Sequence, residues 1–208
     1  FSDYLIVSTT AWIRFNFDFF FFNLDTLLNL ITPGCKIVEV DGLTEGAACT
    51  ALLAKEFIDN DQPLFFANSD QFVEWDSNEF LYKMNETNAD GGIVTFEATH
   101  PKWSFAKINK QGLVTEVAEK KPISNIATVG FYYWKQGSDF VKYAEQMINK
   151  NIRVNNEFYV CPVFNQAIED NKEIRTFNIN GMWGLGTPED LNYYLENYKW
   201  FTYHIEVT

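Results

Sequence analysis

The sequence predicts a single α/β domain in which a mixed, mostly parallel β-sheet is flanked by helices. The chain has 208 residues, 47% of them hydrophobic, which is enough for one buried core but little for two independent domains. Short runs of β-branched and aromatic residues alternate with segments of helical periodicity, a pattern typical of β-α-β units. No repeat, low-complexity linker or charge block divides the chain, so we treat residues 1–208 as one domain.

The first half of the chain alternates between strands and helices. Residues 4–7 predict a strand, and Leu24–Ile31 predict a short helix that ends at Thr32-Pro33-Gly34. The next predicted elements are a strand over 36–40, a helix over 44–58 with Thr44 as N-cap, a strand over 63–68, a helix over 77–86 and a strand over 91–99.

The second half begins with strands that no helix separates. Residues 104–120 predict a β-hairpin that turns at 109–112. The remaining predicted elements are a strand over 128–134, a helix over 138–151 capped by Ser138, a helix near 160–170, a strand over 173–179 and a closing helix over 188–202 with Thr187 as N-cap.

Charge and cysteine content exclude several classes of partner. The formal net charge is −12, so nucleic acid and anionic membrane surfaces would be repelled. The three cysteines, Cys35, Cys49 and Cys161, contain no CxxC pair, which indicates neither a disulfide framework nor a zinc site. We therefore expect a cytoplasmic protein.

The opening segment, residues 11–31, is the one candidate for a membrane span. It holds six phenylalanines between Phe15 and Phe22, but Arg14, Asp18 and Asp25 interrupt it. Three charges in such a span would cost several kcal/mol at a bilayer centre, and the features of a signal peptide are missing. We expect an irregular aromatic segment between a strand and a helix.

A carboxylate, Asp70, follows the most apolar predicted strand by two residues. Ligands of open α/β sheets bind beyond the carboxyl ends of the strands. With Asn68 and Ser69, Asp70 could coordinate Mg²⁺, which favours one or two carboxylates together with phosphate oxygens and waters. The alternative is that Ser-Asp turns the chain or caps the next helix, and the tripeptide alone leaves both open.

Three further segments contain candidate site residues. Glu119 and Lys120 precede Pro122 and form either a solvated turn or a site where lysine neutralises phosphate and glutamate accepts hydroxyls. Gly184 and Gly186 flank Leu185, which suggests backbone passing close to another group. Glu157, before an apolar segment, is a cap or a ligand.

Seven segments together resemble the sugar-phosphate nucleotidylyltransferase family, whose Rossmann-like fold is related to that of the GT-A glycosyltransferases. The resemblance covers about residues 30–200 and is greatest to the small capsule- and surface-polysaccharide branch. The segments are TEGAA (44–48), NSD (68–70), SFAK (104–107), EVAEKKP (116–122), TVGFYYW (128–134), NNEFYV (155–160) and WGLGTPEDL (183–191).

The resemblance implies a role for each matching position. Asp70 corresponds to the Mg²⁺ ligand, and Asp70 and Lys120 to the catalytic residues. Gly46, after Thr44 and Glu45, corresponds to the loop that contacts the nucleobase. The other implied substrate-binding residues are Asn68, Ala106, Glu119, Thr128, Gly130, Glu157 and Trp183.

The resemblance also implies a reaction. An oxygen of a phosphorylated sugar or alcohol attacks the α-phosphorus of an NTP, and pyrophosphate leaves; no covalent nucleophile is needed. The expected cofactor is Mg²⁺, and the expected product is an activated metabolite for surface glycan assembly. Neither the nucleobase nor the acceptor is predicted, and a homo-oligomer stays open.

Two departures from the family pattern affect these expectations. The family's N-terminal Gly-rich phosphate loop is missing, since residues 1–43 contain only Gly34 and Gly42. We expect an N-terminally incomplete domain, or one with an altered opening segment, and impaired catalysis by this chain alone. Gly184 stands where many members carry a second metal-binding aspartate, so we expect weak Mg²⁺ binding without nucleotide.

Two other functions remain open from the sequence. A GT-A glycosyltransferase would use a similar sheet with a DxD metal motif, but position 68 is Asn rather than Asp. A non-catalytic nucleotide- or sugar-binding domain would explain the missing loop.

Overall fold

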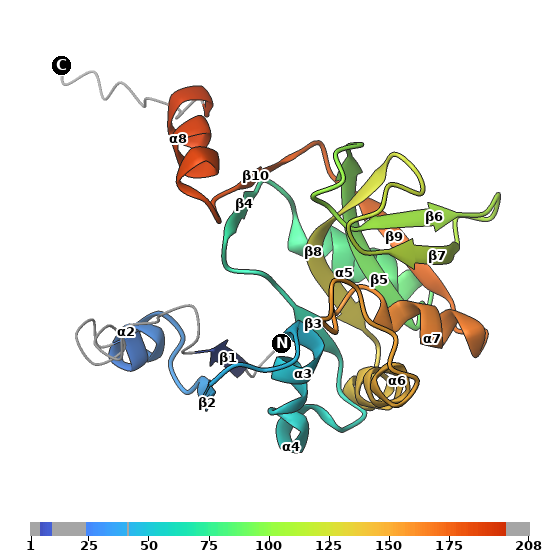
Figure 1. Cartoon of the computed structure of the whole chain (residues 1–208), viewed down its shortest axis with the longest axis horizontal. Coiled ribbons are helices and arrows are strands. Elements are labelled where there is room, and N and C mark those ends of the chain that lie inside the picture. The colour runs from blue at the N-terminus through green and yellow to red at the C-terminus, as the bar shows by residue number, and fades with distance from the viewer. Residues whose placement is uncertain (1–4, 10–23, 41, 199–208) are drawn as a thin grey trace.

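The computed structural model describes residues 5–9, 24–40 and 42–198, with side chains from residue 26 onward. A six-stranded central sheet has the order β7-β6-β8-β5-β9, and β3 also pairs with β8 (Figure 1). Its strands are β3 (Leu64–Phe66), β5 (Gly91–Glu97), β6 (Phe105–Ile108), β7 (Val114–Ala118), β8 (Ile126–Trp134) and β9 (Ile174–Asn178).

The expectation of a mostly parallel sheet is wrong. Only β5 and β9 pair in parallel, whereas the pairs β5–β8, β3–β8, β6–β8 and β6–β7 are antiparallel. The reason is connectivity, because β6, β7 and β8 follow β5 without an intervening helix and strands joined by short links run antiparallel. The mixed α/β character itself is confirmed.

The core lies on both faces of the central sheet. One face carries α3 (Ala47–Leu52), α4 (Lys55–Ile58), α6 (Gly137–Asn149) and α7 (Val163–Glu169), and the other carries α5 (Ser77–Glu86). Successive side chains of β5 and β8 alternate between these faces: Ile93 packs with Phe164 of α7, and Val94 packs with Phe80 of α5. None of the described helices is long and apolar enough to cross a membrane.

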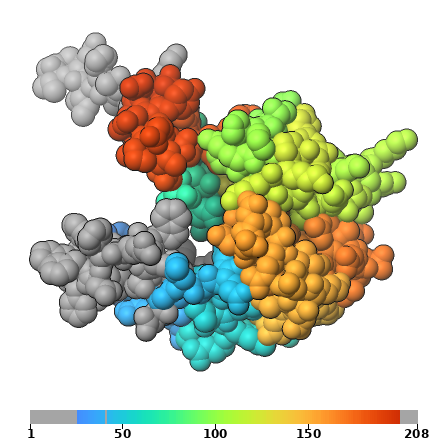
Figure 2. Space-filling model, in the orientation of Figure 1, coloured from blue at the N-terminus to red at the C-terminus, as the bar shows by residue number. Residues whose placement is uncertain are grey.

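Two small sheets lie outside the central one. β1 (Leu5–Thr9) and β2 (Lys36–Val40) pair in parallel and are linked through α2 (Leu24–Ile31). β4 (Gln71–Val73) pairs antiparallel with β10 (Met182–Gly184), which leads into α8 (Pro188–Asn197). Figures 1 and 2 show α8 projecting from the main body. The sequence did not predict β4 or β10.

Several local predictions are confirmed and others are wrong. The helix over 24–31 has the predicted bounds, the hairpin turns at the predicted residues, and Thr187 caps α8 by accepting from the Asp190 N–H.

The helix predicted over 44–58 is divided into α3 and α4, and Gly46 rather than Thr44 is its N-cap. Ser138 is not the cap of α6, which begins one residue earlier after Gln136. The aromatic segment 15–22 lies outside the described residues.

Candidate active site

The hairpin β6–β7 presents two charged residues at its end. Glu119 follows β7, and its carboxylate accepts a hydrogen bond from the Ser104 hydroxyl. Burial raises the pKa of Glu119, while the Ser104 hydrogen bond and the Lys120 charge lower it in part and the Glu157 charge raises it. Ser104 is itself fixed, because its carbonyl accepts from the Thr128 N–H at 2.8 Å. Glu119 is therefore a half-buried, positioned carboxylate.

Lys120 is exposed, but its ammonium group has a defined partner. Its Nζ donates to the Tyr159 hydroxyl at 2.6 Å and lies 4.7 Å from the centre of the Tyr159 ring. The hydrogen bond to Tyr159 raises the pKa of Lys120, and the charges of Glu119 and Glu157 raise it further, against a lowering by burial. The ammonium is thus held charged beside two carboxylates.

Glu157 belongs to the same group of side chains. It affects the pKa of Glu119, Lys120 and Tyr159, and it does so at Tyr159 through a hydrogen bond. We call Ser104, Glu119, Lys120, Glu157 and Tyr159 the Lys120 cluster. The sequence singled out three of its members; Tyr159 stood in a quoted segment and Ser104 began another, but neither was chosen.

The loop before α3 packs against the Lys120 cluster. The Phe158 N–H donates to the Glu45 carbonyl at 2.8 Å, and the Phe158 carbonyl accepts from the Ala48 N–H at 2.9 Å. Gly46 has φ of 125°, and a Cβ atom there would lie 2.6 Å from the Phe158 N and O atoms. This contact requires glycine at position 46; the predicted contact of Gly46 with a nucleobase stays a prediction.

The predicted substrate residues Thr44 and Glu45 have local partners. The Thr44 hydroxyl lies 2.6 Å from that of Thr50. The Glu45 carboxylate forms an ion pair with Arg153, whose guanidinium lies 4.0 Å from the centre of the Phe158 ring. Glu45 therefore borders the cluster through Phe158, and Thr44 is fixed within the loop by Thr50.

Buried polar groups lie behind the cluster. The Thr128 hydroxyl is 3.0 Å from that of Tyr132, and both residues are buried. Burial raises the pKa of Cys161 far above its usual range, with a further contribution from the Glu119 charge; hydrogen bonds to Tyr132 and Ser104 oppose it. Because Cys161 stays a neutral thiol, these groups support the site rather than supplying a nucleophile.

Asp70 lies in the link between β3 and β4 and is exposed. The suggestion that it caps the next helix is wrong, because Asp76 caps α5 by accepting from the Asn78 and Glu79 N–H groups. The Asp70 carbonyl accepts from the Leu185 N–H at 2.7 Å. A Cβ atom at Gly186 would lie 2.7 Å from Asp70 Oδ2, so Gly186 makes room for this carboxylate.

Asn68 and Gln71 connect Asp70 to the central sheet. Gly130 of β8 has φ of 90°, and a Cβ atom there would lie 2.4 Å from Asn68 Nδ2 and 3.4 Å from Gln71 Nε2. Gln71 Nε2 is buried and has no hydrogen-bond partner among the described residues. We call Asn68, Asp70, Gln71, Gly184 and Gly186 the Asp70 strip; Gln71 was not predicted, since only a cross-strand contact reveals it.

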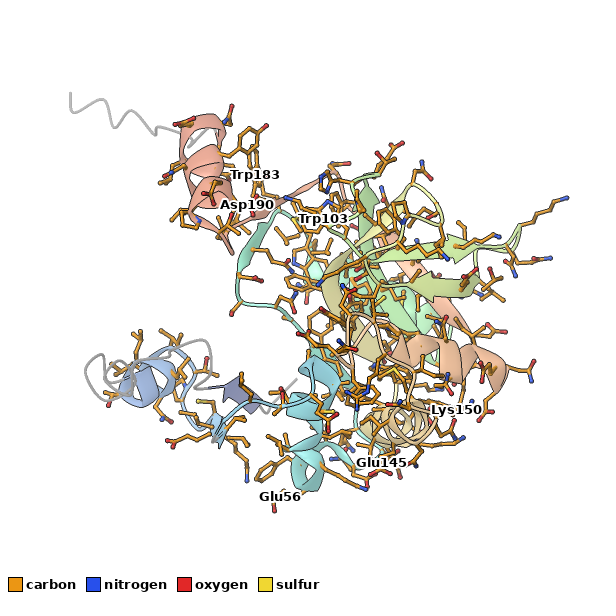
Figure 3. All side chains as sticks on the ribbon, viewed as in Figure 1. Glu56, Trp103, Glu145, Lys150, Trp183 and Asp190 are labelled. Atoms are coloured by element: carbon orange, nitrogen blue, oxygen red, sulfur yellow. The ribbon has the colours of Figure 1, made fainter. Side chains whose placement is uncertain are left out.

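The last two predicted residues have structural surroundings of their own. Trp183 of β10 packs against the rings of Tyr193, Tyr194 and Tyr198 and lies beside α8, near Asp190 (Figure 3). Ala106 is fully buried in the core. These surroundings account for both residues structurally, and their substrate contacts stay predictions.

Among the described residues, Asp70 is the single carboxylate proposed as a metal ligand, without a surrounding group of metal-ligating side chains. No group of three or more His, Cys, Asp or Glu side chains is arranged to hold a metal ion in the described ranges. The second acid nearby, Asp190, lies 3.5 Å from a Cβ at Gly184 but pairs with Lys102 at 3.3 Å. Asp70, which has no ion pair in the described part, fits a Mg²⁺ ion that takes most of its ligands from phosphate and water.

The α/β domain has a lysine ammonium on which the charges of two carboxylates act, and an exposed aspartate after a core strand. These groups can bind phosphorylated substrates. The chain belongs to the nucleotidyl transferase family, whose model matches residues 34–199. This family assignment confirms the class of transferase that the sequence resemblance predicts.

Solved structures with the same fold agree with this assignment. A nucleoside-diphosphate-sugar pyrophosphorylase from Vibrio cholerae RC9 is 22% identical, with a TM-score of 0.76 over 93% of this chain and 80% of that one. A structure named as a glucose-1-phosphate thymidylyltransferase from Bacillus anthracis, in complex with a sucrose, is 13% identical, with a TM-score of 0.62 over 82% and 70%. These likenesses support the fold. A comparison with curated proteins gives no match.

Proposed function

We propose that this chain transfers a nucleotidyl group from an NTP to a sugar phosphate or a similar phosphorylated metabolite and releases pyrophosphate. The observation that carries the proposal is the Lys120 cluster, in which one ammonium lies beside the carboxylates of Glu119 and Glu157. Carboxylates accept hydrogen bonds from hydroxyl groups, and an ammonium neutralises phosphate. The cluster therefore has the chemistry to bind a phosphorylated polyol.

The Asp70 strip would hold the NTP side of the reaction. Asp70 is exposed and Gly186 leaves space at its carboxylate, so we assign Asp70 as the protein ligand of Mg²⁺. A bound Mg²⁺ would neutralise charge on the NTP phosphates. The amide groups of Asn68 and Gln71 beside Gly130 would orient substrate oxygens by hydrogen bonding.

The reaction needs no group from the protein that forms a covalent bond. A phosphate oxygen of the acceptor forms a bond to the α-phosphorus of the NTP while the bond from that phosphorus to the bridging oxygen breaks, and the electron pair leaves with pyrophosphate. Lys120 would hold the attacking phosphate, and Glu119 and Glu157 would orient the acceptor through its hydroxyls. We further propose a cytoplasmic role in surface glycan synthesis, which rests on the resemblance of the seven segments.

Pyrophosphate release tests the proposal. The chain would be assayed with each of the four common NTPs, Mg²⁺ and a panel of sugar 1-phosphates and phosphorylated alcohols. We expect slow release with one NTP–acceptor pair, and at least about a hundredfold loss for Asp70→Asn and for Lys120→Ala, as removal of a transition-state charge partner costs about 3 kcal/mol.

Lys121→Ala provides the matched control, because Lys121 is the adjacent exposed lysine and should keep the parent rate. Nucleotide-sugar hydrolysis without pyrophosphate formation would instead indicate a glycosyltransferase. Tight NTP binding without turnover would contradict the proposal in favour of a non-catalytic domain.

A further inference from the structure

Tyr159 is the central contact of the Lys120 cluster, although no sequence pattern singled it out. Its hydroxyl accepts from Lys120 Nζ at 2.6 Å, and its ring lies under the same ammonium at 4.7 Å. Tyr159 also connects to Glu157 by a hydrogen bond. One side chain thus links the cation and a carboxylate to which separate roles in acceptor binding are assigned above.

We propose that Tyr159 is a positioning residue that keeps the Lys120 ammonium ready for the phosphate group of the acceptor. The inference rests on the proposed function, because it takes the ligand of Lys120 to be that phosphate. The inference goes beyond the proposed function because it names the group that prevents Lys120 from pairing with the neighbouring carboxylates.

The arrangement of charges shows why such a group is needed. Lys120 faces two carboxylates, Glu119 and Glu157, whose charges both act on it. Nevertheless, none of the described ion pairs within 4.0 Å involves Lys120. An ammonium has three N–H donors; one goes to Tyr159, so two remain for a phosphate while the carboxylates stay available for hydroxyls.

The backbone at Lys120 supports the same role. Lys120 has φ of 52°, in the left-handed region, which is unfavourable for a non-glycine residue. Fixing a long lysine side chain also costs rotamer entropy. The Tyr159 hydroxyl and ring offset these costs before a ligand arrives.

Tyr159→Phe separates the hydroxyl from the ring. Without the hydroxyl we expect Lys120 to turn toward Glu119 or Glu157, so the KM for the acceptor should rise about tenfold, the value of one hydrogen bond to a charged group. The KM for the NTP should stay within about twofold, since the NTP is assigned to the Asp70 strip and not to Lys120. A purely structural role would instead lower thermal stability without this separation of the KM for the acceptor from the KM for the NTP.

Tyr143→Phe is the matched control. Lys142 stacks on Tyr143 at 4.5 Å and donates to its hydroxyl at 3.3 Å, which reproduces the lysine–tyrosine contact on α6, a helix that contributes no residue to the Lys120 cluster. Tyr143→Phe should leave the KM for the acceptor unchanged. Equal KM changes in the two variants, or none in Tyr159→Phe, would overturn the proposal.

A second measurement does not depend on turnover. NMR of isotope-labelled lysine side chains can follow the titration of Lys120, assigned with Lys120→Arg, in the wild type and in Tyr159→Phe. The groups that face Lys120 are Glu119, Glu157 and Tyr159. In Tyr159→Phe the ammonium exchanges a neutral hydroxyl acceptor for a carboxylate, so its pKa should rise. If the wild type releases no pyrophosphate, the proposed function fails, and this titration decides alone whether Tyr159 holds Lys120; an unchanged titration overturns the proposal.

Discussion

The Lys120 cluster and the Asp70 strip differ in how far the folded chain completes them. In the Lys120 cluster, Ser104 donates to Glu119 and Lys120 donates to Tyr159. In the Asp70 strip, the buried Gln71 amide nitrogen has no partner among the described residues, and the Asp70 carboxylate has no ion pair there. The Lys120 cluster is therefore organised by its own hydrogen bonds, whereas the exposed Asp70 carboxylate and the buried Gln71 amide nitrogen are not paired within the described residues.

This difference indicates how the two sides contribute to function. An exposed carboxylate such as that of Asp70 loses little on folding and is free to bind a cation. A pre-organised cluster instead reduces the entropy lost on binding. Substitutions in the Lys120 cluster should then affect stability as well as binding, and substitutions in the Asp70 strip should affect activity alone.

The largest expected effect on stability is that of Gly46→Ala. The added Cβ would meet the Phe158 backbone at 2.6 Å with φ of 125° at position 46, and backbone cannot move away as a side-chain end can. We expect the free energy of unfolding to fall by about 3 kcal/mol, from backbone strain and overpacking together. Urea denaturation measures it.

Gly112→Ala isolates the conformational part of this effect. Gly112 also has a positive φ, 76°, but nothing lies within 4 Å of an added Cβ. Gly112→Ala should lower the free energy of unfolding by about 1 kcal/mol. Equal losses at the two glycines would mean that the contact of the loop with Phe158 does not stabilise the protein.

Gly186→Ala tests the Asp70 strip. The added Cβ would lie 2.7 Å from Asp70 Oδ2, the far end of an exposed side chain, so the carboxylate should rotate away at little cost. We expect pyrophosphate release to fall about tenfold, because metal binding depends on the carboxylate position, while the free energy of unfolding changes by less than about 0.5 kcal/mol.

Gly181→Ala is the control for this substitution, since nothing lies within 4 Å of its Cβ position. It should retain the parent rate and stability. If Gly186→Ala unfolds the protein but keeps full activity per folded molecule, the strip is a structural element and not part of the site.

The same division explains which parts of the structure could be predicted. The helix Leu24–Ile31 and the hairpin of β6 and β7 follow from local signals, namely periodicity, Pro-Gly and a turn sequence. Strand direction does not: β5 and β8 were both recognised, but their antiparallel pairing depends on the connection between them. The three-residue strands β4 and β10 are too short to show a period.

Site residues follow a similar rule. Glu119 and Lys120 could be found because they are adjacent charged residues in one segment. Tyr159 lies 39 residues from Lys120 and Ser104 lies 15 from Glu119, so only the fold reveals their contacts. Gln71 is recognisable as a site residue only through its unpaired amide beside Gly130.

The smallest expected effect is a pH dependence of stability at Glu119. Burial raises its pKa above 4.5 in the folded protein, so the folded state retains this proton where the unfolded state has lost it. The resulting stabilisation is complete below about pH 4.5, the unfolded value, and is lost as pH rises through the folded pKa.

Glu119→Gln cannot ionise, so the variant should gain stability relative to the wild type as pH rises across that window. Thermal unfolding at a series of pH values measures the difference, with Glu116→Gln, an exposed carboxylate on β7, as the baseline. A difference that does not change with pH would show that the Ser104 and Lys120 contacts fully offset the burial of Glu119.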